Sequence, residues 1–159
     1  MKRGQYFALL TGVFFLLVGF LGFIPAFVQE PAVSGKSIDL FDAQYGYLMG
    51  AFPINVFHNV VHITVGLLGV LASISLGASR VYGRGLAAFY GLLTLMGLLP
   101  YTNTTFGLIP IFGNDVLLHL STAAIAFYFG FIDAPGLLEL SDRTRDNAEK
   151  FYGDHPSAS

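Results

Sequence analysis

Six polar side chains that could do chemistry stand in two otherwise apolar runs: Asn55, His58, Asn59 and His62 in the first, and Asp115 and His119 in the second. Residues three or four positions apart share one face of a helix, so each run presents its polar groups together. Imidazole, carboxylate and amide groups in such an arrangement can hydrogen-bond to one another, bind a metal or tetrapyrrole, or relay protons.

Three interpretations of this cluster stay open at the level of the sequence. The plainest is a hydrogen-bond network that ties helices together without any cofactor, as amides and imidazoles commonly do between membrane helices. The second is a cofactor site built from all six residues, in which His58, His62 and His119 ligate a metal ion, a haem or a chlorin. The third is a pathway for protons or small solutes. Asp115 taken alone is interpreted as a helix cap.

The composition restricts the class of protein that carries the cluster. Of the 159 residues, 54% are hydrophobic and only 11% are charged, against about 25% charged residues in an ordinary soluble domain. A formal net charge of -2 without a basic cluster argues against binding to nucleic acid. The absence of cysteine excludes disulfides and thiolate metal sites. We therefore expect an integral membrane protein.

Four apolar segments must position the cluster, at about residues 6–27, 53–76, 84–99 and 114–132. A helix that spans a bilayer needs about 20 mostly apolar residues, which predicts an all-α integral membrane four-helix bundle of two tandem helical hairpins. This transmembrane domain would cover residues 1–133 and precede a polar cytoplasmic tail at 134–159. The outer connection over residues 29–52 is long enough for a surface helix that carries Tyr45 and Tyr47.

The positively charged residues indicate the orientation. Every Lys and Arg except Lys36 falls at the termini or in the second connection, and such residues concentrate on the cytoplasmic side. Both termini are therefore predicted to be cytoplasmic, in a bacterial inner (plasma) or thylakoid membrane. His58 and His119 lie at equal depth, roughly 7 to 8 Å below the outer helix starts, because each follows its helix start by five residues. The polar face of the second helix is predicted to point inward.

The motif N-x-x-H-N-x-x-H with glycines after it, from Asn55 to Gly69, and the second run from Asn114 to Leu120 resemble a known family. This family comprises small four-helix membrane proteins of actinobacteria and cyanobacteria and is catalogued as a domain of unknown function. The resemblance covers about residues 2–132. It implies the four-helix membrane fold, and it implies no particular activity or cofactor.

The function expected from these observations is that of a structural or accessory membrane component. Its histidine cluster either binds a metal or tetrapyrrole or makes only hydrogen bonds between the helices. A component for proton or small-solute transport is the alternative. No nucleophile and base are spaced as an enzyme would need them, which argues against catalysis. The expected partners are the lipid bilayer and either another membrane protein or a second copy of the chain.

Overall fold

The computed structural model is mostly helical and describes residues 1–31, 44–133, 145–147 and 149–150. Its main helices are α1 (Arg3–Leu21), α2 (Val56–Ala72), α3 (Leu76–Leu98) and α4 (Asn114–Phe127). A short 3-10 helix η1 (Pro25–Phe27) follows α1, and a π-helical turn η3 (Tyr128–Ile132) extends α4. The described residues between α1 and α2 include three short strands: β1 (Val28–Gln29), β2 (Gly46–Leu48) and β3 (Phe52–Ile54).

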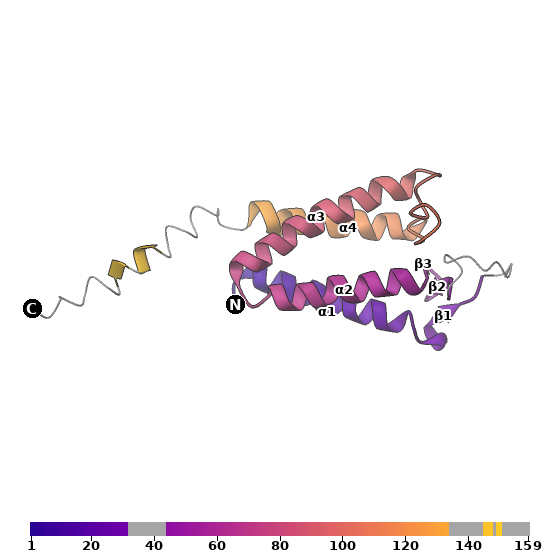
Figure 1. The fold of residues 1–159 in the computed structure, drawn as a ribbon, viewed down its shortest axis with the longest axis horizontal. Helices are drawn as coiled ribbons and strands as arrows, with labels where there is room; N and C mark the ends of the chain where they lie inside the picture. The colour runs from indigo at the N-terminus through magenta and orange to yellow at the C-terminus, as the bar shows by residue number, and fades with distance from the viewer. Residues whose placement is uncertain (32–43, 134–144, 148, 151–159) are drawn as a thin grey trace, which may run out of the picture.

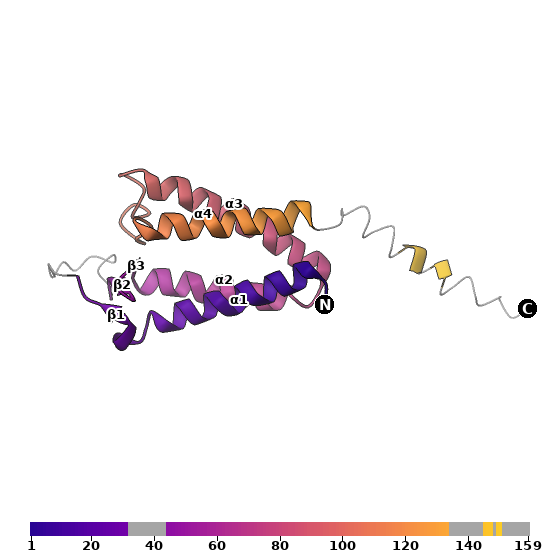
Figure 2. The same ribbon diagram turned by 180° about the vertical axis from the view of Figure 1, so that it is seen from behind.

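The helices form two antiparallel pairs that lie side by side, α1 with α2 and α3 with α4 (Figures 1 and 2). The strands and the loop over residues 101–113 lie at one end of the helices, which we call the sheet end. The start of α1 and the end of η3 lie together at the opposite end, where Arg3 Nη1 is 3.4 Å from Asp133 Oδ1. We call this the terminal end.

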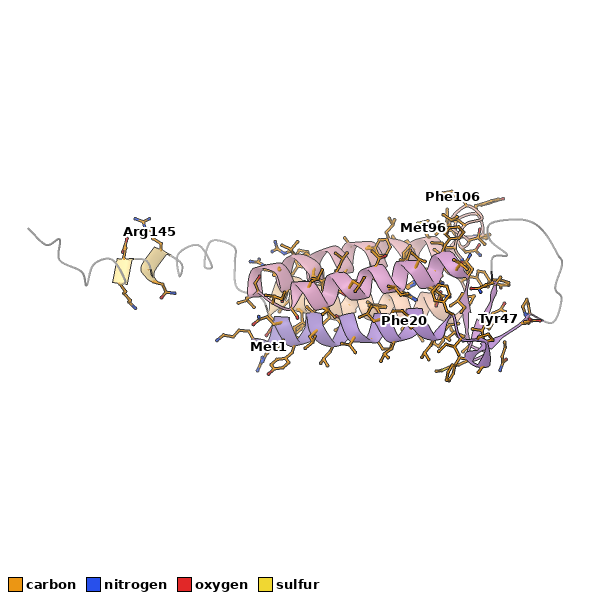
Figure 3. All side chains as sticks on the ribbon, turned by 60° about the horizontal axis from the view of Figure 1, so that its bottom comes forward. Met1, Phe20, Tyr47, Met96, Phe106 and Arg145 are labelled. Carbon is orange, nitrogen blue, oxygen red and sulfur yellow. The ribbon has the colours of Figure 1, made fainter. Side chains whose placement is uncertain are left out.

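In the part of the chain that the structure describes, three helices are long and apolar enough to cross a membrane: α1, α3, and α4 together with η3. The fourth, α2, is equally apolar but has only 17 residues. Large apolar side chains cover the outward faces of all four, among them Leu10, Leu17, Leu67, Leu71, Leu95, Leu117 and Ile125. Figure 3 shows such side chains projecting outward along the helices, with Phe20 as a labelled example. Apolar exposure on this scale is unusual for a soluble protein and suits contact with lipid.

Within each pair, glycines allow the helix backbones to touch. A Cβ atom added to Gly12 of α1 would lie 2.6 Å from the backbone nitrogen of Val70 and 2.8 Å from the carbonyl oxygen of Gly66 on α2. In the other pair, a Cβ atom added to Gly130 would lie 2.8 Å from the backbone nitrogen of Arg84. Small residues at such positions are how membrane helices associate closely, because van der Waals packing replaces the hydrophobic effect there.

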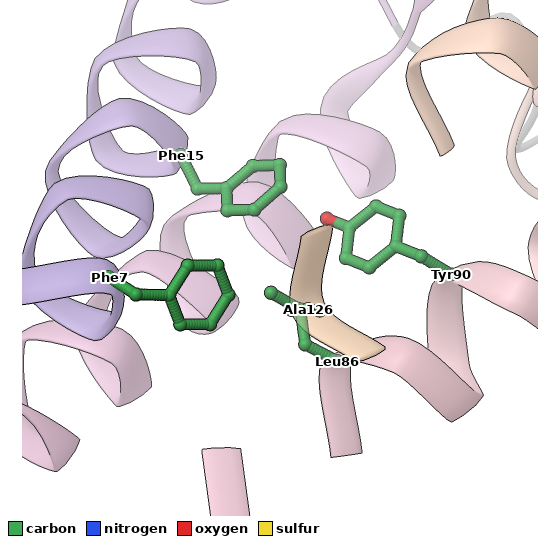
Figure 4. Close-up of a cluster of buried hydrophobic side chains, with 5 residues drawn as sticks. All are labelled: Phe7, Phe15, Leu86, Tyr90 and Ala126. Carbon is green, nitrogen blue, oxygen red and sulfur yellow. The ribbon is translucent and has the colours of Figure 1, made fainter. Parts of the chain in front are cut away.

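A cluster of buried side chains joins the two pairs (Figure 4). Phe7 and Phe15 reach from α1 toward Leu86 and Tyr90 of α3, with Ala126 of α4 between them. The rings of Phe15 and Tyr90 stack with centroids 5.2 Å apart, and both residues are 1% exposed. The hydroxyl group of Tyr90 thus lies in the interior of the molecule, among apolar side chains.

The sheet is a feature that the predicted all-α fold lacks. Its strands are antiparallel in the order β1-β2-β3, and Tyr47 of β2 pairs with Pro53 of β3. Proline is tolerated here because β3 is an edge strand, where its missing N–H breaks no ladder. As a result α2 begins at Val56 and not at residue 53. The surface helix predicted over residues 29–52 is wrong for Tyr47, which lies in a strand, and residues 32–43 fall outside the described residues.

The third helix also begins earlier than its hydropathy suggested. α3 starts at Leu76 instead of residue 84, because the hydroxyl of Ser75 accepts a hydrogen bond from the backbone N–H of Ala78 and caps the helix. The connection between α2 and α3 is therefore short, and Arg80 and Arg84 lie in the first turns of α3. The predicted tail at 134–159 falls almost entirely outside the described residues.

Candidate functional site

Asn55 caps the start of α2 and holds the loop over residues 101–113 against it. Its Oδ1 accepts a hydrogen bond of 2.9 Å from the backbone N–H of His58, which makes Asn55 the N-cap of α2. Its Nδ2 donates to the carbonyl oxygen of Leu108 at 2.7 Å, which ties the loop over residues 101–113 to the start of α2. Asn55 therefore positions the histidine that follows it.

His58 is oriented by the strand before α2. Its Nδ1 lies 3.1 Å from the carbonyl oxygen of Pro53, the residue at the centre of β3. Because a carbonyl oxygen only accepts hydrogen bonds, Nδ1 carries the proton of the neutral ring and donates it to Pro53. Nε2 then presents its lone pair to the interior, where Asp115 Oδ2 lies 3.6 Å away.

Asp115 and His119 lie one turn apart on α4, and both are buried. The N-cap of α4 is Gly113, with a φ of 65°, and no side chain makes a hydrogen bond at this cap. The interpretation of Asp115 as a helix cap is therefore wrong. Its carboxylate instead faces the ring of His58 across the boundary between the two helix pairs.

His58, Asp115 and His119 form the candidate metal centre. Each offers one ligand atom, and these three atoms lie within 4.8 Å of one another. The 3.6 Å between His58 Nε2 and Asp115 Oδ2 is too long for a hydrogen bond. It suits two ligands of one tetrahedral ion, whose atoms lie about 3.3–3.6 Å apart for bonds of about 2.0–2.2 Å. The three residues could thus hold one ion.

Several atoms of this group lack hydrogen bonds although they are fully buried. Asp115 Oδ2 and both ring nitrogens of His119 have no hydrogen-bond partner within the described part of the chain. Burying an unpaired polar group costs about 1–3 kcal/mol, so proteins rarely keep several together without a compensating interaction. This weakens the interpretation as a hydrogen-bond network and favours a bound group that the three atoms share.

His62 takes a different position from the other two histidines. It belongs to a closed ring of five aromatic side chains, to which all four helices contribute. The successive centroid distances are 5.4 Å from Phe15 to His62, 4.5 Å to His58, 6.3 Å to His119, 5.1 Å to Tyr90 and 5.2 Å back to Phe15. His62 is not among the three grouped ligand residues. Its Nδ1 is buried and makes no hydrogen bond to any described residue.

Asn59 lies on the side of α2 that packs against α1. A Cβ atom added to Gly22 would overlap the Asn59 side chain, and one added to Gly19 would lie 2.8 Å from the Asn59 carbonyl oxygen. Neither atom of the Asn59 amide group has a hydrogen-bond partner among the residues described. Asn59 therefore belongs to the α1–α2 contact and not to the group of three ligands.

The inward direction of the polar face on α2 is confirmed, because its buried residues are His58, Asn59, His62, Gly66 and Gly69. The rings of His58 and His119, predicted to lie at equal depth, have centroids 6.3 Å apart, and Asp115 Oδ2 lies 3.6 Å from His58 Nε2. Sequence reasoning missed Tyr90 and the carbonyl oxygen of Pro53. A tyrosine in the middle of an apolar span is a usable signal, because tyrosine normally lies near the membrane surface.

A cavity of about 220 Å³ adjoins the candidate metal centre between the two helix pairs. His58, His62, Tyr90 and His119 line it together with apolar side chains of α2, α3 and the loop over residues 101–113. The loop covers the cavity at the sheet end. Its conformation is stabilised by two hydrogen bonds between the hydroxyl of Thr105 and the backbone N–H and carbonyl groups of Ile109. The side chains of these four residues thus border a space large enough for a small molecule.

The comparisons with known proteins give a family without an assigned activity. A family model described as a domain of unknown function (DUF4383) matches residues 5–132. No curated protein and no solved structure matches the chain. The matched residues include α2, α3, α4, all but the first two residues of α1, and every residue of the candidate site.

Proposed function

The chain belongs to the DUF4383 family, and we propose that it is a non-catalytic membrane component that crosses the bilayer four times and holds a divalent metal ion between its two hairpins. The observation that carries the proposal is the convergence of His58, Asp115 and His119, three buried residues from two helices of different pairs. The ion would link α2 to α4 and thereby determine the relative position of the two helical hairpins.

Four crossings are supported by the length of α2 and its tight partnership with α1. Its 17 residues extend about 25 Å, at the lower limit for a span, and β3 continues the chain outward. The lysines and arginines at the terminal end support a cytoplasmic location of both termini, and the proposed membrane is a bacterial inner (plasma) or thylakoid membrane. The sheet end would then face the opposite side.

The chemistry of the donors supports a transition metal. Two imidazoles and a carboxylate suit Zn²⁺ or Fe²⁺, and a ligating histidine normally donates its other ring N–H to a carbonyl or carboxylate oxygen. The bond from His58 Nδ1 to the Pro53 carbonyl oxygen is such a support. A fourth ligand would come from water or from a molecule in the adjoining cavity. A cavity of about 220 Å³ argues against a haem or chlorin, since even drug-sized ligands need about 300–1,000 Å³.

The transport alternative finds less support in the packing. A relay needs polar groups from one side of the membrane to the other. Toward the terminal end, the centre of the molecule is instead filled by the apolar cluster of Phe7, Phe15, Leu86 and Ala126. A metal centre needs no such path, and we therefore prefer it.

Metal analysis of the purified protein tests the proposal. We expect about one Zn²⁺ per chain after dialysis against excess zinc, and an affinity at least about 100-fold weaker in His119→Ala, which removes a ligand. His62→Ala is the matched control, because it removes a neighbouring imidazole from the same cavity but no ligand. Equal zinc binding by the wild type and His119→Ala would overturn the proposal.

The four crossings need a separate test, which the absence of native cysteine makes simple. Single cysteines introduced at Lys2 and at Tyr101, which is exposed in the loop at the sheet end, would be labelled in intact cells by a membrane-impermeant maleimide. We expect labelling at position 101 only. Labelling at both positions would contradict the proposed orientation.

A further inference from the structure

The three residues of the candidate metal centre are shut away from water. His58, Asp115 and His119 are 3%, 1% and 0% exposed, respectively. A metal site needs an entry path as well as ligands, because the ion arrives hydrated from solution. Some part of the protein that covers the centre must therefore move whenever an ion enters or leaves.

Two directions of approach are unsuitable for an ion. Toward the terminal end, the cluster of buried hydrophobic side chains fills the centre of the molecule (Figure 4). Between α2 and α3, the cavity is bordered by Val61 and Phe89, and the neighbouring outward faces are apolar, as at Val60 and Leu92. A charged ion is costly to place in apolar surroundings within a membrane. The sheet end remains as the side from which an ion can arrive.

At the sheet end, β3 and the loop over residues 101–113 both lie next to the centre. β3 pairs with β2, and its Pro53 carbonyl oxygen orients the ring of His58, so a movement of β3 would disturb a ligand. The loop contributes none of the three ligands. Its residues Thr105, Ile109 and Ile111 line the cavity that adjoins the centre. The loop can thus move while the ligands stay in place.

The tip of this loop has a backbone conformation that needs support. Thr105, Phe106 and Gly107 have φ angles of 47°, 60° and 87°, and a left-handed φ is unusual for a β-branched residue such as Thr105. Such a conformation persists only where the surrounding structure holds it. The hydroxyl of Thr105 donates to the carbonyl oxygen of Ile109 at 2.9 Å and accepts from its N–H at 2.7 Å. Phe106 is 80% exposed, so packing of its ring contributes little support.

We propose that the loop over residues 101–113 is a gate through which the metal ion enters and leaves from the sheet end, and that the Thr105 hydroxyl keeps this gate closed. The hydrogen bond from Asn55 Nδ2 to the Leu108 carbonyl oxygen holds the closed loop against α2. The proposal rests on the metal centre proposed above and adds how access to it is controlled. Thr105 is a positioning residue, because it acts through the loop and not on the ion.

A gate makes a specific kinetic prediction. A change that loosens the loop favours its open state to the same extent with and without a bound ion. An equilibrium between two states shifts the affinity of a ligand only where the ligand distinguishes the states. Loosening the gate therefore raises the rates of metal uptake and metal release together and leaves their ratio, the affinity, unchanged.

Zinc exchange in detergent-solubilised protein tests this prediction. Release is followed after mixing zinc-loaded protein with an excess of a chromogenic chelator, and uptake after mixing metal-free protein with Zn²⁺. Thr105→Val keeps the shape of the side chain and removes both hydrogen bonds. We expect both rates to rise about tenfold or more, at about 3- to 10-fold per bond, with a dissociation constant within about twofold of the wild type. Unchanged rates would overturn the proposal, and so would faster release with unchanged uptake.

Two variants control for a general loss of stability. Thr105→Ser retains the hydroxyl and should exchange zinc at the wild-type rates. Thr102→Val makes the same change in the same loop, at a hydroxyl that donates to the Met96 carbonyl oxygen of α3 and not to the tip of the loop. We expect wild-type rates for this variant also. Equal acceleration in Thr102→Val and Thr105→Val would contradict the role of Thr105.

Cleavage of the loop in the folded wild type keeps the test decisive if Thr105→Val does not fold. Chymotrypsin should cut after Tyr101 or Phe106, because both are exposed in the loop and exposed loops are preferred sites of proteolysis. The cut protein retains its three ligands and should release zinc at least about tenfold faster than the intact protein. Release at the rate of the intact protein would overturn the gate. A wild type that binds no zinc would instead refute the metal centre itself, so the two failures are distinguishable.

Discussion

Replacing Gly12 by alanine should separate α1 from α2, and the expected cost follows from the distances. The new Cβ atom would lie 2.6 Å from the backbone nitrogen of Val70, whereas ordinary contacts begin near 3.4 Å. The neighbouring atoms belong to the backbone of α2, so no side chain can rotate away. The helices must then move apart by about 0.8 Å, a gap that forfeits about a quarter to a half of each contact energy along the interface.

We expect Gly12→Ala to lower the free energy of unfolding by about 1–3 kcal/mol, the usual range for overpacking. The matched control is Gly91→Ala on α3, where an added Cβ atom meets nothing within 4 Å. That variant should be neutral or stabilised by up to about 1 kcal/mol, because alanine favours the helix over glycine. Unfolding would be followed by near-ultraviolet circular dichroism in mixed detergent and dodecyl sulfate micelles. Equal stability of the two variants would refute the backbone contact.

Three further predictions use the same unfolding measurement. Gly130→Ala should cost about 1–3 kcal/mol, because its Cβ atom would lie 2.8 Å from the backbone nitrogen of Arg84; wild-type stability would contradict the close α3–α4 contact. Asn55→Ala should cost about 1–2 kcal/mol through the lost helix cap, and a change below about 0.3 kcal/mol would show that the cap contributes little. Arg3→Ala should change stability by less than about 1 kcal/mol, because the Arg3 side chain of its ion pair with Asp133 is 80% exposed; a larger loss would mean that the pair holds α1 and η3 together.

The polar face of α2 could be predicted from the sequence, because its spacing fixes which side chains share a direction. An apolar opposite face left only the interior for His58, Asn59 and His62, and all three are buried. The proximity of His58 and His119, whose ring centroids lie 6.3 Å apart, agrees with counting residues from the helix starts, whereas the approach of Asp115 to His58 was not predicted. Spacing alone could not decide which imidazoles converge, since His62 lies one turn from His58 but joins the aromatic ring and not the ligand group.

The remaining features depend on tertiary contacts that leave a weak trace in the sequence. Strands of two or three residues carry no detectable alternation, so the sheet and the Pro53 carbonyl that orients His58 were not foreseen. Hydropathy predicts too late a start for α3, because it responds to the charges of Arg80 and Arg84 and not to the helix cap at Ser75. Tyr90 looked like one more apolar residue of its helix, although it closes the aromatic ring and lines the cavity.

The most direct test of the metal centre is anomalous diffraction at the zinc absorption edge from crystals of the protein grown with zinc. We predict one anomalous peak within about 2.0–2.2 Å of His58 Nε2, a carboxylate oxygen of Asp115 and a ring nitrogen of His119. A structure without a peak at these three residues, or with zinc bound only at surface positions, would contradict the claim that they hold a metal ion.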